Sequence, residues 1–229
     1  DLGVLNNRLT ASLDYYWKYN NDMLSSLQLP HTIGIDVPEV NIGKLKTWGW
    51  EIEIGWKDKI KDFSYQVSFN LSDSQNKLLK YDGASVVSEG SVSLLEGYEL
   101  NSIWGYKTDG YWKSREEYEQ YKSDHPGYKS FNDGVVSGGD VKYLVQGNAD
   151  HQLSAGGATP EDSGDLVYLG NSNGRYLYGL NLSAQWKGFD FNVMFQGVGK
   201  RNILVDASAI APFYNSQQMP WTIHRDYWT

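Results

Sequence analysis

The sequence contains no cysteine among its 229 residues, which excludes disulfide bonds, thiolate metal sites and cysteine nucleophiles together. It also lacks any apolar run of about 18 residues, so a transmembrane helix is excluded. Basic residues are scarce: 20 Lys and Arg against 28 Asp and Glu give a net charge of −8. A nucleic-acid partner needs a basic face, and none is expected here.

The two ends of the sequence do not look like the ends of a protein. Residues 1–5 lack the basic segment and the long apolar segment of a signal peptide, and residues 225–229 read like the interior of a sequence. We therefore expect a fragment of a longer protein. Aromatic residues make up 14% of the chain and charged residues 21%, which argues against both disorder and an ordinary helical domain.

Strict alternation of apolar and polar residues is the dominant pattern. Successive side chains of a strand point to opposite faces, so each alternating segment has one apolar face and one polar face. The helical spacing of apolar residues fits none of these segments. The sequence therefore predicts five strands, which cover residues 8–19, 48–57, 63–71, 176–186 and 189–197.

The predicted strands have the length and the aromatic ends of membrane-spanning strands. A tilted strand of about 9–11 residues crosses the hydrocarbon layer, and amphipathic rings prefer the headgroup level. A soluble β-sandwich with an aromatic core is the alternative. The aromatic residues expected at the membrane interface are Trp17, Tyr19, Trp48, Trp50, Trp56, Tyr176 and Trp186.

The connections between strands favour the membrane interpretation. The predicted turns at 58–62 and 187–188 are short, and Asn6-Asn7 is suited to a tight turn before the first strand. The connections 20–47 and 72–175 are long and fall on the opposite side of an antiparallel sheet. Outer-membrane barrels have this asymmetry, with short periplasmic turns and long extracellular loops. Five strands cannot close in lipid, so we expect an all-β fold: antiparallel transmembrane strands of a larger barrel.

The long extracellular insert, residues 72–175, carries most of the negative charge. It holds 16 Asp and Glu against 9 Lys and Arg, which is typical of a solvated surface. One short helix is predicted at 115–121, with Ser114 as its N-cap and Glu117 completing a capping box.

A dense group of aromatic residues in this insert is a candidate binding surface. Rings in an exposed loop can stack on sugars or on a partner protein. The alternative is that they form the small core of the insert itself. The candidate residues are Trp104, Tyr106, Tyr111 and Trp112.

Acidic residues in the insert raise the question of calcium. The oxygen-bearing residues are Asp140, Asn148, Asp150, Glu161, Asp162 and Asp165. The segment 146–151 has a neutral amide at Gln146, where a calcium loop has its first carboxylate, and lacks the required glycine. We expect no cofactor and no metal, with calcium as the less favoured alternative.

No catalytic pattern stands out. The four histidines, at 31, 125, 151 and 224, are scattered, and neither a nucleophile elbow nor a phosphate-binding loop is present. A glycosidase pair of carboxylates is possible in principle, but nothing selects two of them. The chain is not expected to be an enzyme.

Residues 165–180 and 186–201 are similar to the late barrel region of one protein family, the SusC/RagA-type TonB-dependent outer-membrane transporters. Supporting segments are 15–24, 41–51, 139–143 and 221–229. The acidic loop after residues 139–143 departs from the family pattern at Gln146, Ala149 and His151, which puts a metal role in doubt.

The resemblance implies a 22-stranded barrel with an N-terminal plug, in the outer membrane of a Gram-negative bacterium. It also implies energy supply through TonB, a SusD-like surface lipoprotein as partner, and oligosaccharide or peptide cargo. A passive porin would share the strands but lack the plug. The residues by themselves also leave open a soluble carbohydrate-binding β-sandwich and a surface hydrolase.

Overall fold

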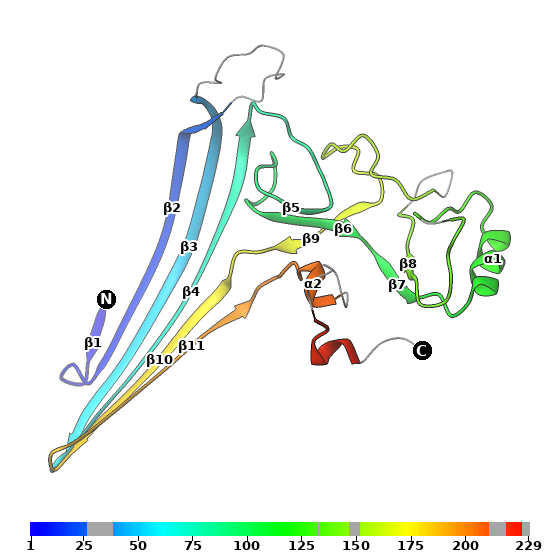
Figure 1. Cartoon of the computed structure of the whole chain (residues 1–229). Helices are drawn as coiled ribbons and strands as arrows, with labels where there is room; N and C mark the ends of the chain where they lie inside the picture. Colours follow the sequence, from blue (N-terminus) through cyan, green and yellow to red (C-terminus); the bar gives the residue numbers. More distant parts are fainter. Residues whose placement is uncertain (27–38, 132, 147–151, 211–218, 226–229) are drawn as a thin grey trace. The chain divides into compact units, whose positions relative to one another are not determined.

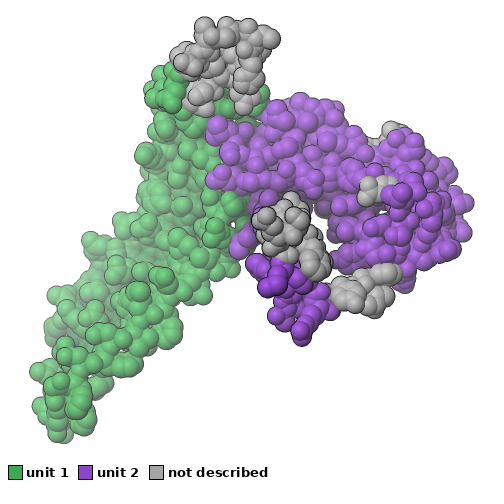
Figure 2. Space-filling model, viewed as in Figure 1, with its two compact units in different colours: residues 1–84, 96–100, 171–202 green, residues 85–95, 101–170, 203–229 purple. Residues whose placement is uncertain are grey.

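The computed structural model describes residues 1–26, 39–131, 133–146, 152–210 and 219–225. The chain forms two compact units, which Figure 2 distinguishes by colour. Unit 1 comprises residues 1–84, 96–100 and 171–202, and unit 2 comprises residues 85–95, 101–170 and 203–229. Among the described residues, none of the helices has both the length and the apolar character needed to span a membrane.

Unit 1 is built on a six-stranded antiparallel sheet with the order β1-β2-β3-β4-β10-β11. Its strands are β1 (Leu2–Val4), β2 (Leu9–Ser26), β3 (Glu39–Ile60), β4 (Phe63–Tyr81), β10 (Arg175–Trp186) and β11 (Phe189–Lys200). The long strands run side by side, and β10 pairs with β4 although they are distant in sequence (Figure 1). Within the described residues β1 and β11 are the two edges, so this sheet does not close on itself.

A strand lies over each of the five predicted ranges, and several strands are longer than predicted. β2 continues to Ser26, β3 begins at Glu39, and β4 ends at Tyr81, so the predicted connections 20–47 and 72–175 are too long. The added residues include lysines on the otherwise apolar face, which end the apolar alternation although the strand pairing continues. The segment between β2 and β3 lies outside the described residues.

The short turns adopt left-handed backbone conformations. Lys187 and Gly188 have φ angles of 45° and 87°, the pattern of a two-residue hairpin turn. Asn6 and Asn7, at φ 58° and 59°, lie in the turn between β1 and β2, as predicted. The predicted connection 58–62 is shorter than expected: β3 continues to Ile60, and only two residues separate it from β4.

The strand register aligns the apolar residues of all five long strands on one face. Leu13 pairs with Ile52, and Ile52 pairs with Leu71 of β4. Farther along β4, Val67 pairs with Leu182, which pairs with Val193 of β11. Because neighbouring partners in a sheet share a face, the alternation of each strand continues across the sheet. Unit 1 therefore has one apolar face, which we call the outer face, and one polar face, which we call the inner face.

The far end of β4 extends beyond its pairing with β10 and is paired with a returning segment instead. The Leu78 amide donates to Tyr98 O at 2.9 Å, and the Gly97 amide donates to Leu78 O at 2.8 Å. The Leu100 amide donates to Asn76 Oδ1 at 2.8 Å. These bonds satisfy backbone groups of β4 that would otherwise have no partner in the sheet.

Unit 2 contains small elements with a core of their own. It has a three-stranded sheet, β5-β6-β9, and a two-stranded ribbon, β7-β8. These elements are β5 (Gly90–Val92), β6 (Ser102–Tyr106), β7 (Thr108–Tyr111), β8 (Val141–Tyr143), β9 (Leu166–Asn171), α1 (Arg115–Asp124), α2 (Ala207–Ile210) and a 3₁₀ turn (Thr222–Arg225).

The helix α1 begins where the sequence predicts and runs three residues longer. Ser114 is its N-cap, with its hydroxyl accepting a hydrogen bond from the Glu117 amide at 3.3 Å. The Glu117 carboxylate accepts from the Lys113 amide at 2.7 Å, one residue before the position of an ordinary capping box. The predicted cap is confirmed.

Candidate functional site

The outer face of unit 1 carries exposed apolar side chains over its full width. Leu13 is 69% exposed, Trp17 is 64% exposed and Phe189 is 74% exposed. A soluble protein rarely leaves a contiguous apolar surface of this kind uncovered. The surface has the composition of a strand face that contacts lipid.

Most of the predicted interface aromatics form two rows on this face. In the first row Trp17 pairs directly with Trp48, and the neighbouring rungs hold Tyr19 and Trp50. In the second row, at the end with the short turns, Trp186 pairs with both Phe63 and Phe189.

Trp56 lies close to the second row. It donates from Nε1 to the Tyr65 hydroxyl at 3.2 Å. Trp56 lies eight positions after Trp48 in the same strand. At the rise of a β-strand this spacing is about 27 Å. The apolar band of an outer-membrane barrel is about 25 Å tall, and strand tilt shortens the projected spacing, so the two rows suit its two borders.

Tyr176 differs from the other interface candidates. Its backbone φ of 55° is left-handed, and the register pairs its two neighbours with β11 but not Tyr176 itself. Next to it, the Arg175 guanidinium makes a two-pronged ion pair with the buried carboxylate of Asp73. Asp73 and Arg175 are 102 positions apart in the sequence, so no local sequence pattern predicts that they pair.

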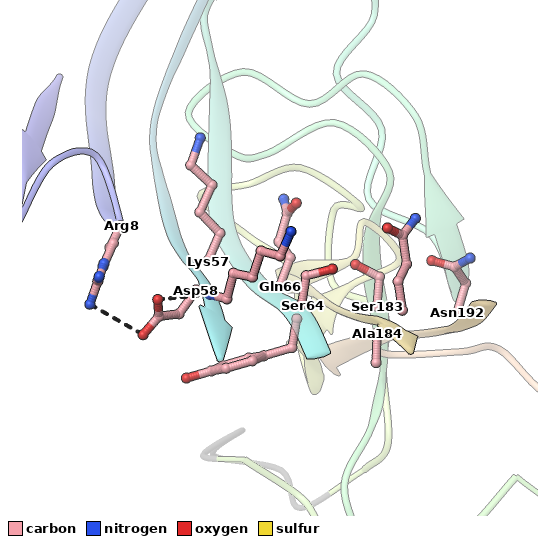
Figure 3. A pocket seen from close by; sticks show the side chains of 11 residues that line it. Arg8, Lys57, Asp58, Ser64, Gln66, Ser183, Ala184 and Asn192 are labelled. Atoms are coloured by element: carbon pink, nitrogen blue, oxygen red, sulfur yellow. Dashed lines mark hydrogen bonds and ion pairs between the residues drawn. The ribbon is translucent and has the colours of Figure 1, made fainter. Parts of the chain in front are cut away.

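The inner face is polar and hollowed. Near the short turns a concave region is lined by side chains from β3, β4, β10 and β11 and from the turn before β2, including Arg8, Lys57, Gln66, Ser183 and Asn192 (Figure 3). Arg8 pairs with Asp58 there at 3.4 Å. A second hollow on the same face is lined partly by acidic side chains, namely Asp14, Glu51 and Glu53. A polar wall of this kind suits a water-filled or protein-filled barrel interior.

Trp112 does not offer a stacking surface, because it forms the centre of the core of unit 2. It is fully buried, and its ring makes edge contacts with Tyr118 at 5.1 Å and Tyr128 at 6.3 Å. The Lys142 ammonium lies 4.9 Å from its ring centroid and also pairs with Asp109 at 3.3 Å. A ligand therefore has no open ring face of Trp112 to contact.

The other three candidates are distributed between interior and surface. Trp104 is buried, donates to Ser102 Oγ at 3.1 Å and contacts Tyr168 edge-on. Tyr106 is partly buried and contacts the half-exposed ring of Phe131 at 4.8 Å. Tyr111 is 60% exposed. The predicted group is thus split: Trp104 and Trp112 belong to the interior, and Tyr111 remains accessible.

The tyrosines around Trp112 have shifted titration behaviour because they are removed from water. Burial raises the pKa of Tyr128 to about 12. Burial, together with a hydrogen bond to Asp133, also raises the pKa of Tyr118. The Lys122 ammonium, 2.6 Å from Asp133 Oδ1, and the Tyr118 hydroxyl lower the pKa of Asp133. Tyr118, Lys122 and Asp133 are thus linked by hydrogen bonds that hold them in place.

The acidic residues considered for calcium act as local backbone acceptors. Asp165 accepts from the amides of Gln146 and Ser154, at 2.6 and 2.9 Å. Asp140 accepts from the Ser137 amide and Asp162 from the Gly157 amide, at 2.9 and 2.8 Å. Asn148, Ala149, Asp150 and His151 lie outside the described residues. In the part of the chain that the structure describes, no three His, Asp or Glu side chains gather as metal ligands would.

Comparison with known proteins gives consistent matches over most of the chain. No family model matches. TonB-dependent receptor P26 of Formosa agariphila is 29% identical over 206 residues, covering 86% of this chain and 19% of the relative. TonB-dependent receptor SusC of Bacteroides thetaiotaomicron is 24% identical over 204 residues, covering 84% of this chain and 18% of the relative.

Solved structures agree with these relatives. The structure of the RagAB peptide transporter matches with a TM-score of 0.60 and 21% identity, over 85% of this chain and 19% of that chain. This likeness shows the fold, a section of a transporter barrel. The resemblance to SusC/RagA-type TonB-dependent receptors is confirmed. The chain spans about a fifth of the length of the curated relatives that it matches.

Proposed function

We propose that this chain is a wall section, with one large external insert, of a TonB-dependent transporter in the outer membrane of a Gram-negative bacterium. The observation that carries the proposal is the outer face of unit 1, which is apolar across five paired strands and bordered by two aromatic rows. The three short turns all lie at one end of the same sheet, which fits the periplasmic side of a barrel.

The open edges of the sheet support a larger barrel. Unpaired backbone groups of β1 and β11 would cost several kcal/mol each in hydrocarbon. Pairing with further strands of the same protein removes this cost. A soluble sandwich would need a second sheet over the outer face, whereas the outer-face aromatics of unit 1 are largely exposed.

The transported cargo is an oligosaccharide or a peptide, and a SusD-like lipoprotein assists its capture. Tyr111 and the ring pair Tyr106–Phe131 are among the accessible aromatics of unit 2 and suit contacts with cargo or partner. Flat rings at the surface favour both sugars and protein interfaces. Trp104 and Trp112 support this surface from inside. No cofactor takes part, and the chain binds and gates rather than catalyses.

The test is uptake by cells that express the whole protein. Cells with the gene deleted are grown on a panel of oligosaccharides and peptides as sole nutrient, with and without the restored gene. We expect the restored gene to rescue growth on one class of nutrient, and inactivation of TonB to abolish the rescue. Rescue that persists without TonB would indicate a passive porin instead.

The partner is tested separately by affinity purification of the whole protein from outer membranes. We expect a surface lipoprotein to co-purify in about equal amounts. Tyr111→Ala is expected to weaken cargo uptake or lipoprotein retention without changing the amount of protein in the membrane. The matched control is Ser123→Ala, on the exposed surface of α1. Equal uptake and retention by both variants would remove Tyr111 from the binding surface.

A further inference from the structure

Two rungs of the sheet place lysines opposite each other. Lys46 of β3 pairs with Lys77 of β4, and Lys44 pairs with Lys80 two rungs farther on, beyond the Leu45–Leu78 pair and a register shift. Neighbouring strands are about 4.8 Å apart and alternate residues of one strand about 7 Å. Like charges placed directly opposite each other destabilise a sheet. An anion between the ammonium groups would relieve this repulsion.

The register assigns these lysines to the outer face, just beyond the first aromatic row. Lys46 lies two residues before Trp48 in β3 and pairs with Tyr19 of β2, a residue of that row. The Lys46 ammonium lies 5.2 Å from the Trp48 ring centroid and 5.8 Å from that of Tyr19. Lys44 lies 5.7 Å from the same Tyr19 ring. The charges are therefore held against the aromatic row, on the side away from the short turns.

Little protein charge offsets these lysines. Lys80 pairs with Asp82 at 2.9 Å. Among the residues that the structure describes, no carboxylate forms an ion pair with Lys44, Lys46 or Lys77. Three neighbouring cations thus have no acidic partner in the described chain, and two of them, Lys44 and Lys46, lie against aromatic rings. An external anion would offset their charge.

The position of the lysines on the outer face indicates which kind of anion they bind. If the short turns are periplasmic, as in the proposed function, the lysines stand at the headgroup level of the outer leaflet. Basic residues next to an aromatic row attract anionic lipid headgroups, and an ammonium binds phosphate as a point charge. A lipid also places its acyl chains along the exposed outer face below, which a soluble anion does not.

We propose that Lys44, Lys46 and Lys77, against Tyr19 and Trp48, form a binding site for the phosphate-bearing headgroup of an outer-leaflet lipid. The inference rests on the proposed function, because it requires this end of the sheet to lie in the outer leaflet. The bound lipid neutralises the lysine pairs and covers the aromatic row. The site is separate from the inner face and from the cargo surface of unit 2.

The first test uses the whole protein, purified in mild detergent, and the phosphorylated glycolipid extracted from the same outer membrane. Binding is measured for the wild type and for Lys44→Gln/Lys46→Gln/Lys77→Gln. We expect the affinity to fall roughly fivefold for each lysine removed. The matched control is Lys57→Gln/Lys59→Gln/Lys61→Gln, around the opposite end of β3, which should bind as the wild type does. Equal binding by both triple variants would overturn the proposal.

The second test does not depend on the folding of a variant. The wild-type protein is offered the same lipid after enzymatic removal of its phosphates, and we expect binding to fall by a similar factor. Inorganic phosphate in millimolar excess should displace little of the intact lipid, because the acyl chains contribute to binding. Unchanged binding of the dephosphorylated lipid, or complete displacement by free phosphate, would contradict a lipid-phosphate site.

The two proposals fail in distinguishable ways. If the whole protein reaches the outer membrane and supports TonB-dependent growth, but binds both lipid forms equally, only the lipid site is wrong. If it neither enters the outer membrane nor supports uptake, the proposed function itself is wrong. The Lys44→Gln/Lys46→Gln/Lys77→Gln variant should retain cargo specificity, since its lysines lie on the outer face.

Discussion

Aromatic residues lie on the outside of the sheet in unit 1, whereas in unit 2 they form the interior. Trp17 is 64% exposed on the outer face, and Trp112 is fully buried among tyrosines. The same residue types therefore act in two ways within one chain. In unit 2 they stabilise the fold by packing on one another. In unit 1 the aromatic rings are exposed on the sheet. Lipid would bury them there, whereas in unit 2 the rings are buried by neighbouring side chains.

The difference also appears in the distribution of charge. Lysines and carboxylates of unit 2 form pairs around its core, such as Lys122–Asp133 and Lys142–Asp109. On the outer face of unit 1 the long central part is uncharged, and charges lie at or beyond the aromatic rows, as with Asp73 opposite Trp50. Charge therefore marks the borders of the layer that the sheet crosses.

The largest effect is expected from truncation of the unit 2 core. Trp112→Ala removes the ring at the centre of the aromatic cluster and should destabilise unit 2 by about 3–5 kcal/mol. The adjacent, exposed Tyr111→Ala should change stability by no more than about 0.5 kcal/mol. Limited proteolysis of unit 2 in the membrane-inserted protein measures both. Similar protease sensitivity of the two variants would mean that Trp112 is not a core residue.

The corresponding change in unit 1 is a charge on the outer face. Leu182, paired with Val67 and Val193, lies midway between the aromatic rows. Leu182→Arg should cost about 2–4 kcal/mol through transfer of a cation to the bilayer centre and should lower the amount of assembled protein. Its neighbour Ser183 points to the inner face, so Ser183→Arg should assemble normally. The amount of assembled protein of each variant is measured by heat-modifiable gel mobility. Equal assembly of the two variants would contradict the assignment of Leu182 and Ser183 to opposite faces of the sheet.

A smaller effect is expected at the cap of α1. Ser114→Ala removes the acceptor for the Glu117 amide and should destabilise the helix by about 1 kcal/mol. Ser123→Ala, in the last turn of the same helix, should be neutral or slightly stabilising because alanine favours helix. Amide hydrogen exchange of α1 in the whole protein reports both changes. Unchanged protection in Ser114→Ala would show that packing of Tyr118 alone holds the helix.

The smallest effect is a pH dependence confined to unit 2. Lys122 and Tyr118 lower the pKa of Asp133 below its ordinary value of 3.8. The unfolded state therefore binds the proton more tightly, so the pairing stabilises unit 2 above pH 3.8 and is lost as the pH falls through the folded pKa. Asp133→Asn should flatten this part of the pH profile of hydrogen exchange in unit 2. A profile identical to that of the wild type would exclude Asp133 as its source.

The sequence alone is sufficient to predict the faces of the strands but not all of their ends. Alternation identifies Leu13, Ile52 and Leu182 as one face, because a strand has a fixed period of two. Alternation does not predict the strand ends at Ile60 and Tyr81. Backbone pairing continues to these residues through segments in which polar side chains interrupt the apolar face. Strand length there depends on the partner strand and not on local composition.

Local composition is also insufficient for the candidate sites. Trp112 and Tyr111 are adjacent in the sequence, and only tertiary packing makes one buried and the other exposed. The Asp73–Arg175 pair and the Lys46–Lys77 pair each require the strand register, which joins residues far apart in the chain. The predicted cap at Ser114, in contrast, depends on four consecutive residues and is visible in the sequence.

The central claim is that the outer face of unit 1 contacts lipid, and β11 tests it most directly. This chain has no cysteine, so single cysteines placed at consecutive positions from 189 to 196 can be labelled with a fluorophore in a whole protein from which any other cysteine has been removed. Lipids with brominated acyl chains should quench the label at Phe191→Cys and Val193→Cys strongly and at Asn192→Cys weakly, so that quenching alternates along the strand. Equal quenching at odd and even positions, or quenching at the even ones only, would contradict the account.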